Sequence, residues 1–202
     1  MTTDGSDSLA NGSYQCMPRE VLRHGRYSVT AVRTDHIEDI RRWRNAQMDV
    51  LRQPAPISPD AQEAYFASKI WPHKDSLQPG NILLSYSEDD VAIGYGGLVH
   101  IAWEHRRAEV SFLLGGDSEY DVDRRDLLFS SFLGLIQGLA FLDLGLERLW
   151  TETYAHRTGH IDTLERCGFR QEGVLRSHVH IAGAPTDAIV HGCLVTEMEN
   201  TG

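Results

Sequence analysis

Hydrophobic and polar positions along this chain follow two periods, and each period predicts a different kind of element. Short stretches in which apolar residues alternate with polar ones, or run together, predict β-strands. Stretches with apolar residues three or four positions apart predict helices. The expected strands are Tyr27–Val32, Asn81–Tyr86, Val91–Trp103, Ala108–Leu114, Arg148–Tyr154 and a closing pair within Phe169–Leu194.

Helix boundaries can be placed from capping residues. Thr34 is the expected cap of a first helix, and Ser58 followed by proline is typical of the start of a second. A long apolar helix is expected to end at Gly145 and a shorter one at Gly168. The resulting order is strand, two helices, three strands, long helix, strand, helix and two strands. This order predicts an α/β (α+β) protein with a mixed sheet.

Length and composition fit one globular domain. The chain has 202 residues, of which 41% are hydrophobic and 24% charged, as in average globular proteins. Residues 1–20 are polar and rich in Gly and Ser, so we expect a flexible N-terminal arm there. Residues 21–202 are then expected to form a single domain.

Charge and cysteine content exclude several classes of function. A formal net charge of −10 argues against a broad nucleic-acid-binding surface. Cys16, Cys167 and Cys193 are widely spaced, so neither a disulfide framework nor a metal site is expected. No uninterrupted apolar run is long enough to span a bilayer, and no secretory signal is evident. We expect a cytoplasmic monomer or homodimer with no membrane contact.

Local motifs distributed along the chain carry a family resemblance. They are Trp43-Arg44-Asn45 followed by Ile57-Ser-Pro, Ile93–His100 followed by Arg107–Phe112, Leu164–Phe169 with Glu172–Arg176, and Gly183–Asp187. Their order and spacing resemble the GNAT superfamily of N-acyltransferases, in particular its ribosomal-protein and amino-sugar acetylating branches. The resemblance implies a GNAT fold: a mixed sheet of about six to seven strands, with a splayed pair of parallel strands, and four helices.

The chain departs from the family where the pyrophosphate of the donor acyl-CoA would bind. Family members carry a glycine-rich loop before the long helix, since side chains there would block the donor. In this chain the loop glycines are replaced by Leu127 and Phe129. We expect Arg124 and Arg125 to hold the phosphates instead.

The following helix departs from the family as well. Arg157-Thr-Gly-His160 stands where relatives often have Asn-x-x-Ser, and Leu164 stands where many have a tyrosine that protonates the leaving thiolate. The donor half is therefore changed, while the acceptor half matches the family. The expected donor contacts are Arg124, Arg125, Arg157 and the strand end at Leu113 and Leu114.

Amine acylation needs a base, an oxyanion donor and an acid. Glu109 is the candidate base or ammonium anchor, the alternative being a structural carboxylate paired with Arg107 or His100. Tyr154 and His160 are the candidate acids; a buried core aromatic is the alternative for Tyr154. The candidate acceptor contacts are Trp43, Arg44, Asn45, Tyr95 and His100.

Three functions are compatible with these residues. The first is an N-acyltransferase that acylates a small-molecule amine with acyl-CoA as co-substrate. The second is a GNAT-like transferase that takes its acyl group from the acceptor end of an aminoacyl-tRNA and needs no pyrophosphate loop. The third is a non-catalytic GNAT-like binding module. The intact acceptor motifs favour the first two over the third.

Overall fold

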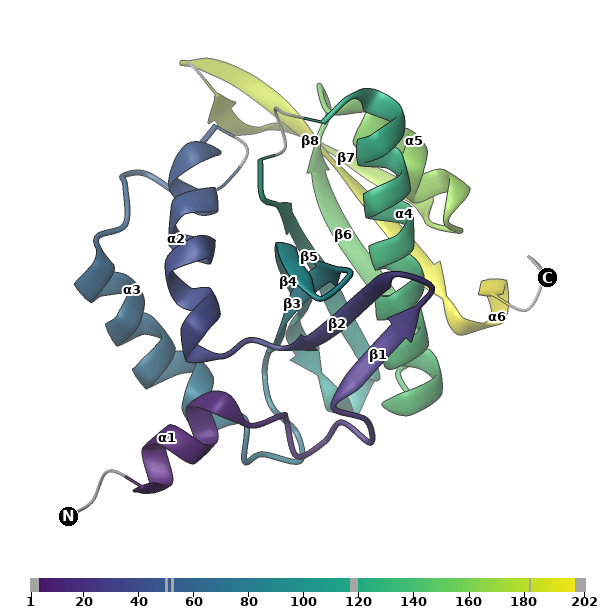
Figure 1. The fold of residues 1–202 in the computed structure, drawn as a ribbon. Helices are drawn as coiled ribbons and strands as arrows, with labels where there is room; N and C mark the ends of the chain where they lie inside the picture. The colour runs from purple at the N-terminus through teal and green to yellow at the C-terminus, as the bar shows by residue number, and fades with distance from the viewer. Residues whose placement is uncertain (1–3, 50, 52, 117–119, 182, 199–202) are drawn as a thin grey trace.

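The computed structural model describes residues 4–49, 51, 53–116, 120–181 and 183–198. One mixed sheet with the strand order β1-β2-β3-β4-β5-β6-β8-β7 runs through the molecule (Figure 1). The strands are β1 Val21–His24, β2 Tyr27–Ala31, β3 Ile82–Glu88, β4 Val91–Ala102, β5 Arg107–Leu114, β6 Arg148–Tyr154, β7 Arg170–Ile181 and β8 Ala184–Leu194. The α-helices are α1 Asp4–Asn11, α2 Ile37–Ala46, α3 Pro59–Tyr65, α4 Val122–Gln137, α5 Thr158–Arg166 and α6 Val195–Met198.

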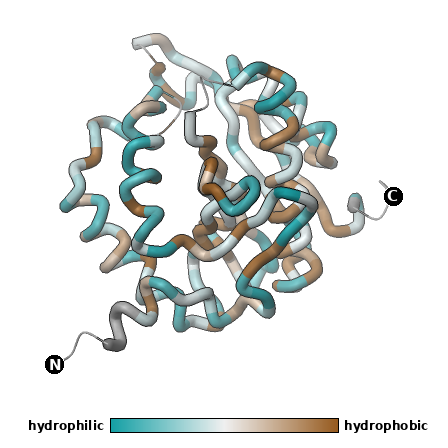
Figure 2. Tube along the Cα trace, viewed as in Figure 1, coloured by the Kyte–Doolittle hydropathy of each residue, from teal (hydrophilic) through white to brown (hydrophobic). Residues whose placement is uncertain are grey.

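Helices cover both faces of the sheet (Figure 1). The larger core joins α4 and α5 to one face, and its fully buried side chains include Phe132, Leu149 and Leu164. The smaller core joins α2 and the segment after α3 to the other face, around Ile40 and Phe66. Hydrophobic residues gather where the central strands meet α4 (Figure 2). The expected mixed sheet with helices on its faces is confirmed.

The sheet has one strand more than the six to seven expected. β1 was not anticipated from the pattern, because its four residues bury only Leu22. It pairs with β2 in antiparallel register through a turn at Gly25, whose φ of 57° suits glycine. The four expected helices correspond to α2–α5, and α1 and α6 are additional.

Two capping predictions had opposite outcomes. Ser58 caps α3 as expected, because its hydroxyl accepts a hydrogen bond from the Ala61 amide at 3.2 Å. The prediction that Thr34 caps the following helix is wrong. Its hydroxyl donates instead to Asn11 Oδ1 at 2.8 Å, and a 3₁₀ turn over Thr34–His36 precedes α2. The side chain of Thr34 is thus used to attach the N-terminal segment.

The expectation of a flexible arm over residues 1–20 is wrong for the part from Ala10 to Met17; residues 1–3 lie outside the described residues. Ala10, Tyr14 and Met17 are buried, and the Tyr14 hydroxyl accepts a hydrogen bond from the Leu83 amide at 2.9 Å. Lys74, only 1% exposed, donates from Nζ to three main-chain carbonyls. These are the carbonyls of Ala10 at 2.9 Å, Gly12 at 2.8 Å and Val32 at 2.7 Å.

The strands β5 and β6 form the parallel pair and separate along their length. They pair only through Arg107 to Glu109 and Arg148 to Trp150. Beyond that point β5 stays paired with β4 up to Leu114, and β6 stays paired with β8 up to Tyr154. The edges that face each other across this gap thus keep main-chain groups without a sheet partner, and the predicted splayed parallel pair is present.

The helix α4 and the turn after it form the most apolar segment of the described chain. Val122–Asp143 is long and apolar enough to cross a membrane by length and composition alone. Leu128, Phe132, Leu133 and Ile136 are nevertheless fully buried against the sheet. Packing in the domain core accounts for this composition.

Replacing Lys74 with methionine tests how the N-terminal segment is held. Lys74→Met leaves three carbonyls without their donor, and we expect a loss of about 3 kcal/mol of unfolding free energy. We also expect faster protease cleavage within residues 8–17, measured by limited proteolysis and mass spectrometry. Lys69→Met, on an exposed side chain of the segment after α3, is the control. Unchanged cleavage in Lys74→Met would contradict the assigned role of Lys74.

Candidate active site

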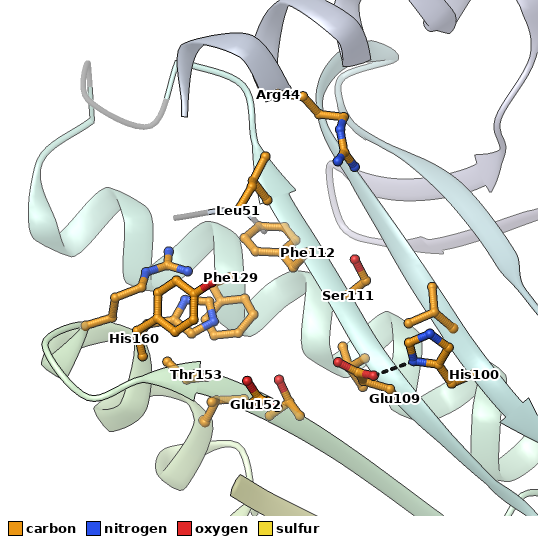
Figure 3. Close-up of a pocket in the computed structure, with 16 residues that line it drawn as sticks. Arg44, Leu51, His100, Glu109, Ser111, Phe112, Phe129, Glu152, Thr153 and His160 are labelled. Atoms are coloured by element: carbon orange, nitrogen blue, oxygen red, sulfur yellow. Dashed lines mark hydrogen bonds and ion pairs between the residues drawn. The ribbon is translucent and has the colours of Figure 1, made fainter. Parts of the chain in front are cut away.

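A cavity of about 460 Å³ lies where β5 and β6 separate. Both strands line it, and side chains from α2, α4 and α5 complete it (Figure 3). Alternation along β5 decides which residues enter from which side. Leu113 belongs to the core under α2, so Ser111 and Glu109 face that side, whereas Phe112 faces α4 and α5. The gap therefore joins a polar side to an aromatic one.

Glu109 and His100 form an ion pair at the edge of this cavity. The His100 Nδ1 lies 2.7 Å from Glu109 Oε2, and the carboxylate is 16% exposed while the imidazole is 72% exposed. His100 lies at a β-bulge in β4 and has a φ of 49°, which is uncommon for a residue other than glycine. The bulge directs the imidazole toward Glu109 (Figure 3). The pairing of Glu109 with His100, one of the alternatives from sequence, is thus present.

A second carboxylate, Glu152, enters the same cavity from β6 and was missed in the sequence. Its side chain is 8% exposed and lies 3.5 Å from Nε2 of His178 on β7. In the parallel register Glu109 is opposite Trp150, so Glu152 shares the face of Glu109. The sequence feature that could have identified Glu152 is its charge at a position that alternates with the buried positions of β6.

Arg44 lines the cavity opposite the carboxylates (Figure 3). Its Nη1 donates to the Tyr95 hydroxyl at 2.9 Å and its Nε donates to Gln53 Oε1 at 3.1 Å. Burial raises the pKa of Tyr95, although the nearby Arg44 lowers it, so the phenol is a neutral acceptor. These two contacts fix the plane of the guanidinium.

Trp43 and Asn45 flank Arg44 in sequence but do not line the cavity. Asn45 Oδ1 accepts from the Ile57 amide and from Gln53 Nε2, both at 2.8 Å. The Trp43 indole packs so closely on Gly115 that an added Cβ would lie 2.3 Å from the ring. Asn45 holds the loop after α2, and Trp43 packs against the residue that follows β5. The expectation that they contact the acceptor directly is not supported by this arrangement.

A stack of three rings lies under the gap on the side of α4 and α5. The Phe112 and Phe129 ring centroids are 4.8 Å apart, and the Phe129 and His160 centroids are 3.9 Å apart at an interplanar angle of 15°. All three residues line both this cavity and a neighbouring one of about 590 Å³. The bulky Phe129, at a position of a family glycine, is therefore a wall between the two cavities.

His160 is held neutral in this stack. Burial lowers the pKa of its imidazole well below the usual value, and the charges of Arg157 and His191 lower it further. A neutral imidazole donates or accepts one hydrogen bond but cannot release a proton as imidazolium near neutral pH. Of the two candidate acids, Tyr154, which also lines the 460 Å³ cavity, is the better placed.

The N-terminus of α4 is occupied by a side chain of the protein itself. The Asp121 carboxylate accepts a hydrogen bond from the Arg124 amide at 2.8 Å, in the position where family members bind a phosphate. Arg124 donates to the Tyr27 hydroxyl at 2.9 Å and pairs with Glu88. Arg124 therefore lies outside both cavities, contrary to the expectation that it holds the donor.

The other expected donor contacts do come together. Leu113, Leu114, Arg125 and Arg157 line the 590 Å³ cavity, together with the first turn of α5. α5 has no side-chain cap at its N-terminus, and Thr158 and Gly159 of its first turn line this cavity. The residues present fit an extended amide-containing arm along the strand edges and a phosphate between two arginines. They do not reproduce the family's phosphate contact at α4.

Comparison with known proteins agrees with this geometry. The family described as "Acetyltransferase (GNAT) domain" matches residues 29–190. The chain therefore belongs to the GNAT acetyltransferase family and is an N-acyltransferase. No match to the sequence is found among curated proteins.

Solved structures show the same fold at low identity. Spermidine N-acetyltransferase from Vibrio cholerae, in complex with CoA and spermine, has a TM-score of 0.74 at 19% identity, covering 88% of this chain and 100% of that one. A probable GNAT-family acetyltransferase from Chromobacterium violaceum has a TM-score of 0.71 at 20% identity, covering 93% and 92%. These similarities concern the fold.

The suppressed protonation of His160 predicts a pH dependence of stability. Below a pH of about 6.5 the unfolded chain protonates this histidine and the folded chain does not, so stability falls as the pH falls. A histidine that cannot be protonated in the folded state lowers the free energy of unfolding by up to about 1.4 kcal/mol for each pH unit below its unfolded pKa. His160→Phe retains the ring stack and should show a shallower decrease between pH 6.5 and 5.5 in urea unfolding. An unchanged slope would contradict the neutral state of His160.

Proposed function

We propose that this N-acyltransferase acylates the amine of a small molecule with an acyl-CoA as donor. The observation that carries the proposal is the pair of carboxylates, Glu109 and Glu152, which enter one cavity from the two strands that separate. A cationic amine has its counter-charge there, next to the main-chain edges that an acyl donor needs. Both substrates would thus meet at the gap.

The carboxylates would first bind the ammonium and then accept its proton. Glu109 is the assigned base, because its 2.7 Å contact with His100 links the cavity to an exposed imidazole. The exposed imidazole of His100 could pass the proton on to solvent. Glu152 keeps the second negative charge beside the amine.

Main-chain and arginine groups would hold the donor. Acyl-CoA, when bound, supplies the activated acyl group. The unpaired edges of β5 and β6 offer amides and carbonyls to its pantetheine arm, and an amide on β5 beyond Glu109 would donate to the carbonyl oxygen as negative charge develops. Arg125 and Arg157 are assigned to the phosphates, because both line the 590 Å³ cavity.

Tyr154 is assigned to return a proton to the leaving sulfur. It ends β6 and lines the cavity, and its hydroxyl can donate a hydrogen bond there. His160 would contribute one neutral hydrogen bond and the packing of the ring stack. This division of roles follows from the environments of the two side chains.

One observation favours aminoacyl-tRNA as an alternative donor. Asp121 fills the helix terminus where the family places pyrophosphate, and such a donor needs no contact there. Asp126 and Asp162 line the proposed donor cavity together with Arg125 and Arg157. The carboxylates offset the guanidinium charges, so the net positive charge available to bind phosphate is small. Since phosphate contacts supply most affinity for nucleic acid, we retain acyl-CoA as the first proposal.

Removing the charge of Glu109 tests the assigned base. Glu109→Gln should lower kcat/KM on the order of 100-fold at neutral pH, because the amide cannot accept the amine proton. The measurement is thiol release from acyl-CoA with an accepted amine. Glu104→Gln, an exposed glutamate just before β5, is the matched control. An unaltered rate in Glu109→Gln would contradict a role as base.

Calorimetric titration with acetyl-CoA tests the donor. We expect micromolar binding that weakens at least tenfold in Arg125→Gln and in Arg157→Gln, because each variant loses a charged phosphate contact. Arg106→Gln is the control, since Arg106 is exposed and paired with Glu147. Absence of binding up to millimolar acetyl-CoA would contradict the acyl-CoA proposal and would direct the search to charged tRNA.

A further inference from the structure

A third cavity, of about 390 Å³, lies between α2, α3 and β4. Its lining is mostly apolar and includes Ile40, Phe66, Leu83 and Tyr95. Of the described residues that line it, only Arg44 carries a charge. A cavity of this size and chemistry is suited to an aromatic or large aliphatic group.

This apolar cavity adjoins the polar one at the gap. Arg44, Val99 and Ser111 line both cavities, so one small molecule can extend from the carboxylates into the space between α2 and α3. Arg44 lies at the junction and points toward the polar cavity (Figure 3). The side chain therefore separates a place for an amine from a place for an apolar group.

The guanidinium of Arg44 forms no ion pair with the described residues, although Glu109 and Glu152 line the same cavity. Its hydrogen-bond partners are the neutral Gln53 and Tyr95, which engage Nε and Nη1. The Nη2 group has no partner in the described part of the chain, although the side chain is half-buried. A half-buried guanidinium with a fixed plane and an unused donor is suited to bind a carboxylate.

We propose that the acceptor is an α-amino acid, or a close analogue, with a large apolar side chain. This inference rests on the proposed function and specifies its acceptor. The amine would lie at Glu109 and Glu152, the adjacent carboxylate would bind Arg44, and the side chain would fill the apolar cavity. The amine nitrogen then attacks the thioester carbonyl carbon, so that the C–N bond of the amide forms and the C–S bond of the donor breaks. The amine proton passes to Glu109, and the leaving thiolate takes a proton from Tyr154 and departs as the free thiol.

A polyamine fits this site less well. A further ammonium beside Arg44 would meet a like charge, and one inside the apolar cavity would have no carboxylate among the described residues that line it. A simple hydrophobic amine would fill the apolar cavity but would leave Arg44 without an anion. The three acceptor classes can therefore be separated by binding alone.

The first experiment titrates the protein with L-phenylalanine, phenethylamine and spermidine by calorimetry, without any acyl donor. L-Phenylalanine should bind at least tenfold more tightly than the other two, and Arg44→Gln should remove this preference for the carboxylate. Arg42→Gln is the matched control, because Arg42 lies on the same helix with an exposed side chain paired to Asp39. Thermal melts of both variants establish that they fold.

A second variant tests the apolar cavity without touching Arg44. Ala61→Phe places a ring in the cavity, whereas Ala64→Phe places it on the same helix outside the lining. We expect Ala61→Phe to weaken L-phenylalanine binding at least tenfold and to leave L-alanine binding unchanged. Ala64→Phe should alter neither.

Three results would overturn the inference: tighter binding of spermidine, equal binding of phenethylamine and L-phenylalanine, or an Arg44→Gln variant that binds L-phenylalanine as the wild type does. Failure of the proposed function is a separate outcome. In that case L-phenylalanine binds as predicted, but no N-acyl product forms with acetyl-CoA by mass spectrometry.

Discussion

The separation of β5 from β6 is the constraint on which the rest of the site depends. Pairing stops after Glu109 and Trp150, although each strand keeps its other neighbour to its end. A gap inside a sheet would normally leave buried main-chain groups without partners, which costs free energy. Here the gap opens to two cavities, and the stack of Phe112, Phe129 and His160 packs beneath it. In the proposed function, the same gap would offer main-chain groups to a donor and expose two carboxylates to an amine.

The proposed donor side and the proposed acceptor side of this gap have different chemistry. On the donor side, the capped terminus of α4 and the pairing of Arg124 with Glu88 leave Arg125 and Arg157 as the cationic lining. On the acceptor side, two carboxylates and one arginine stand at the entrance of an apolar cavity. The affinity for a donor would therefore come more from the strand edges than from a phosphate loop.

Much of the architecture could be predicted from the sequence, because hydrophobic periodicity and helix capping depend on residues that are close together in the chain. The strands β2–β8, the Ser58 cap and the helix stop at Gly145 were expected, and Gly145 has a φ of 65°. The packing of the N-terminal segment could not be predicted, because it depends on Lys74 reaching carbonyls more than forty residues away. The prediction that Thr34 is a helix cap was wrong for the same reason, because its hydrogen-bond partner, Asn11, is distant in the sequence.

The candidate site was predictable in part. Glu109, His100 and Arg44 were identified from strand position and motif, whereas Glu152 depends on a register that no local pattern specifies. Arg124 and Arg125 are neighbours in sequence, yet only Arg125 lines the donor cavity, because helical geometry turns Arg124 toward β2 and β3. Phe129 was recognised as a departure from the family, but its stacking partners come from β5 and α5.

The most direct test of this account is an amide chemical-shift titration with CoA, followed by NMR on the ¹⁵N-labelled protein. If the separated edges hold the donor, the largest shifts will fall on amides of Ser111–Leu114 and Glu152–Tyr154, with smaller shifts at the first turn of α5. Shifts confined to other strands, or none at saturating CoA, would contradict the claim that the gap between β5 and β6 is the donor site.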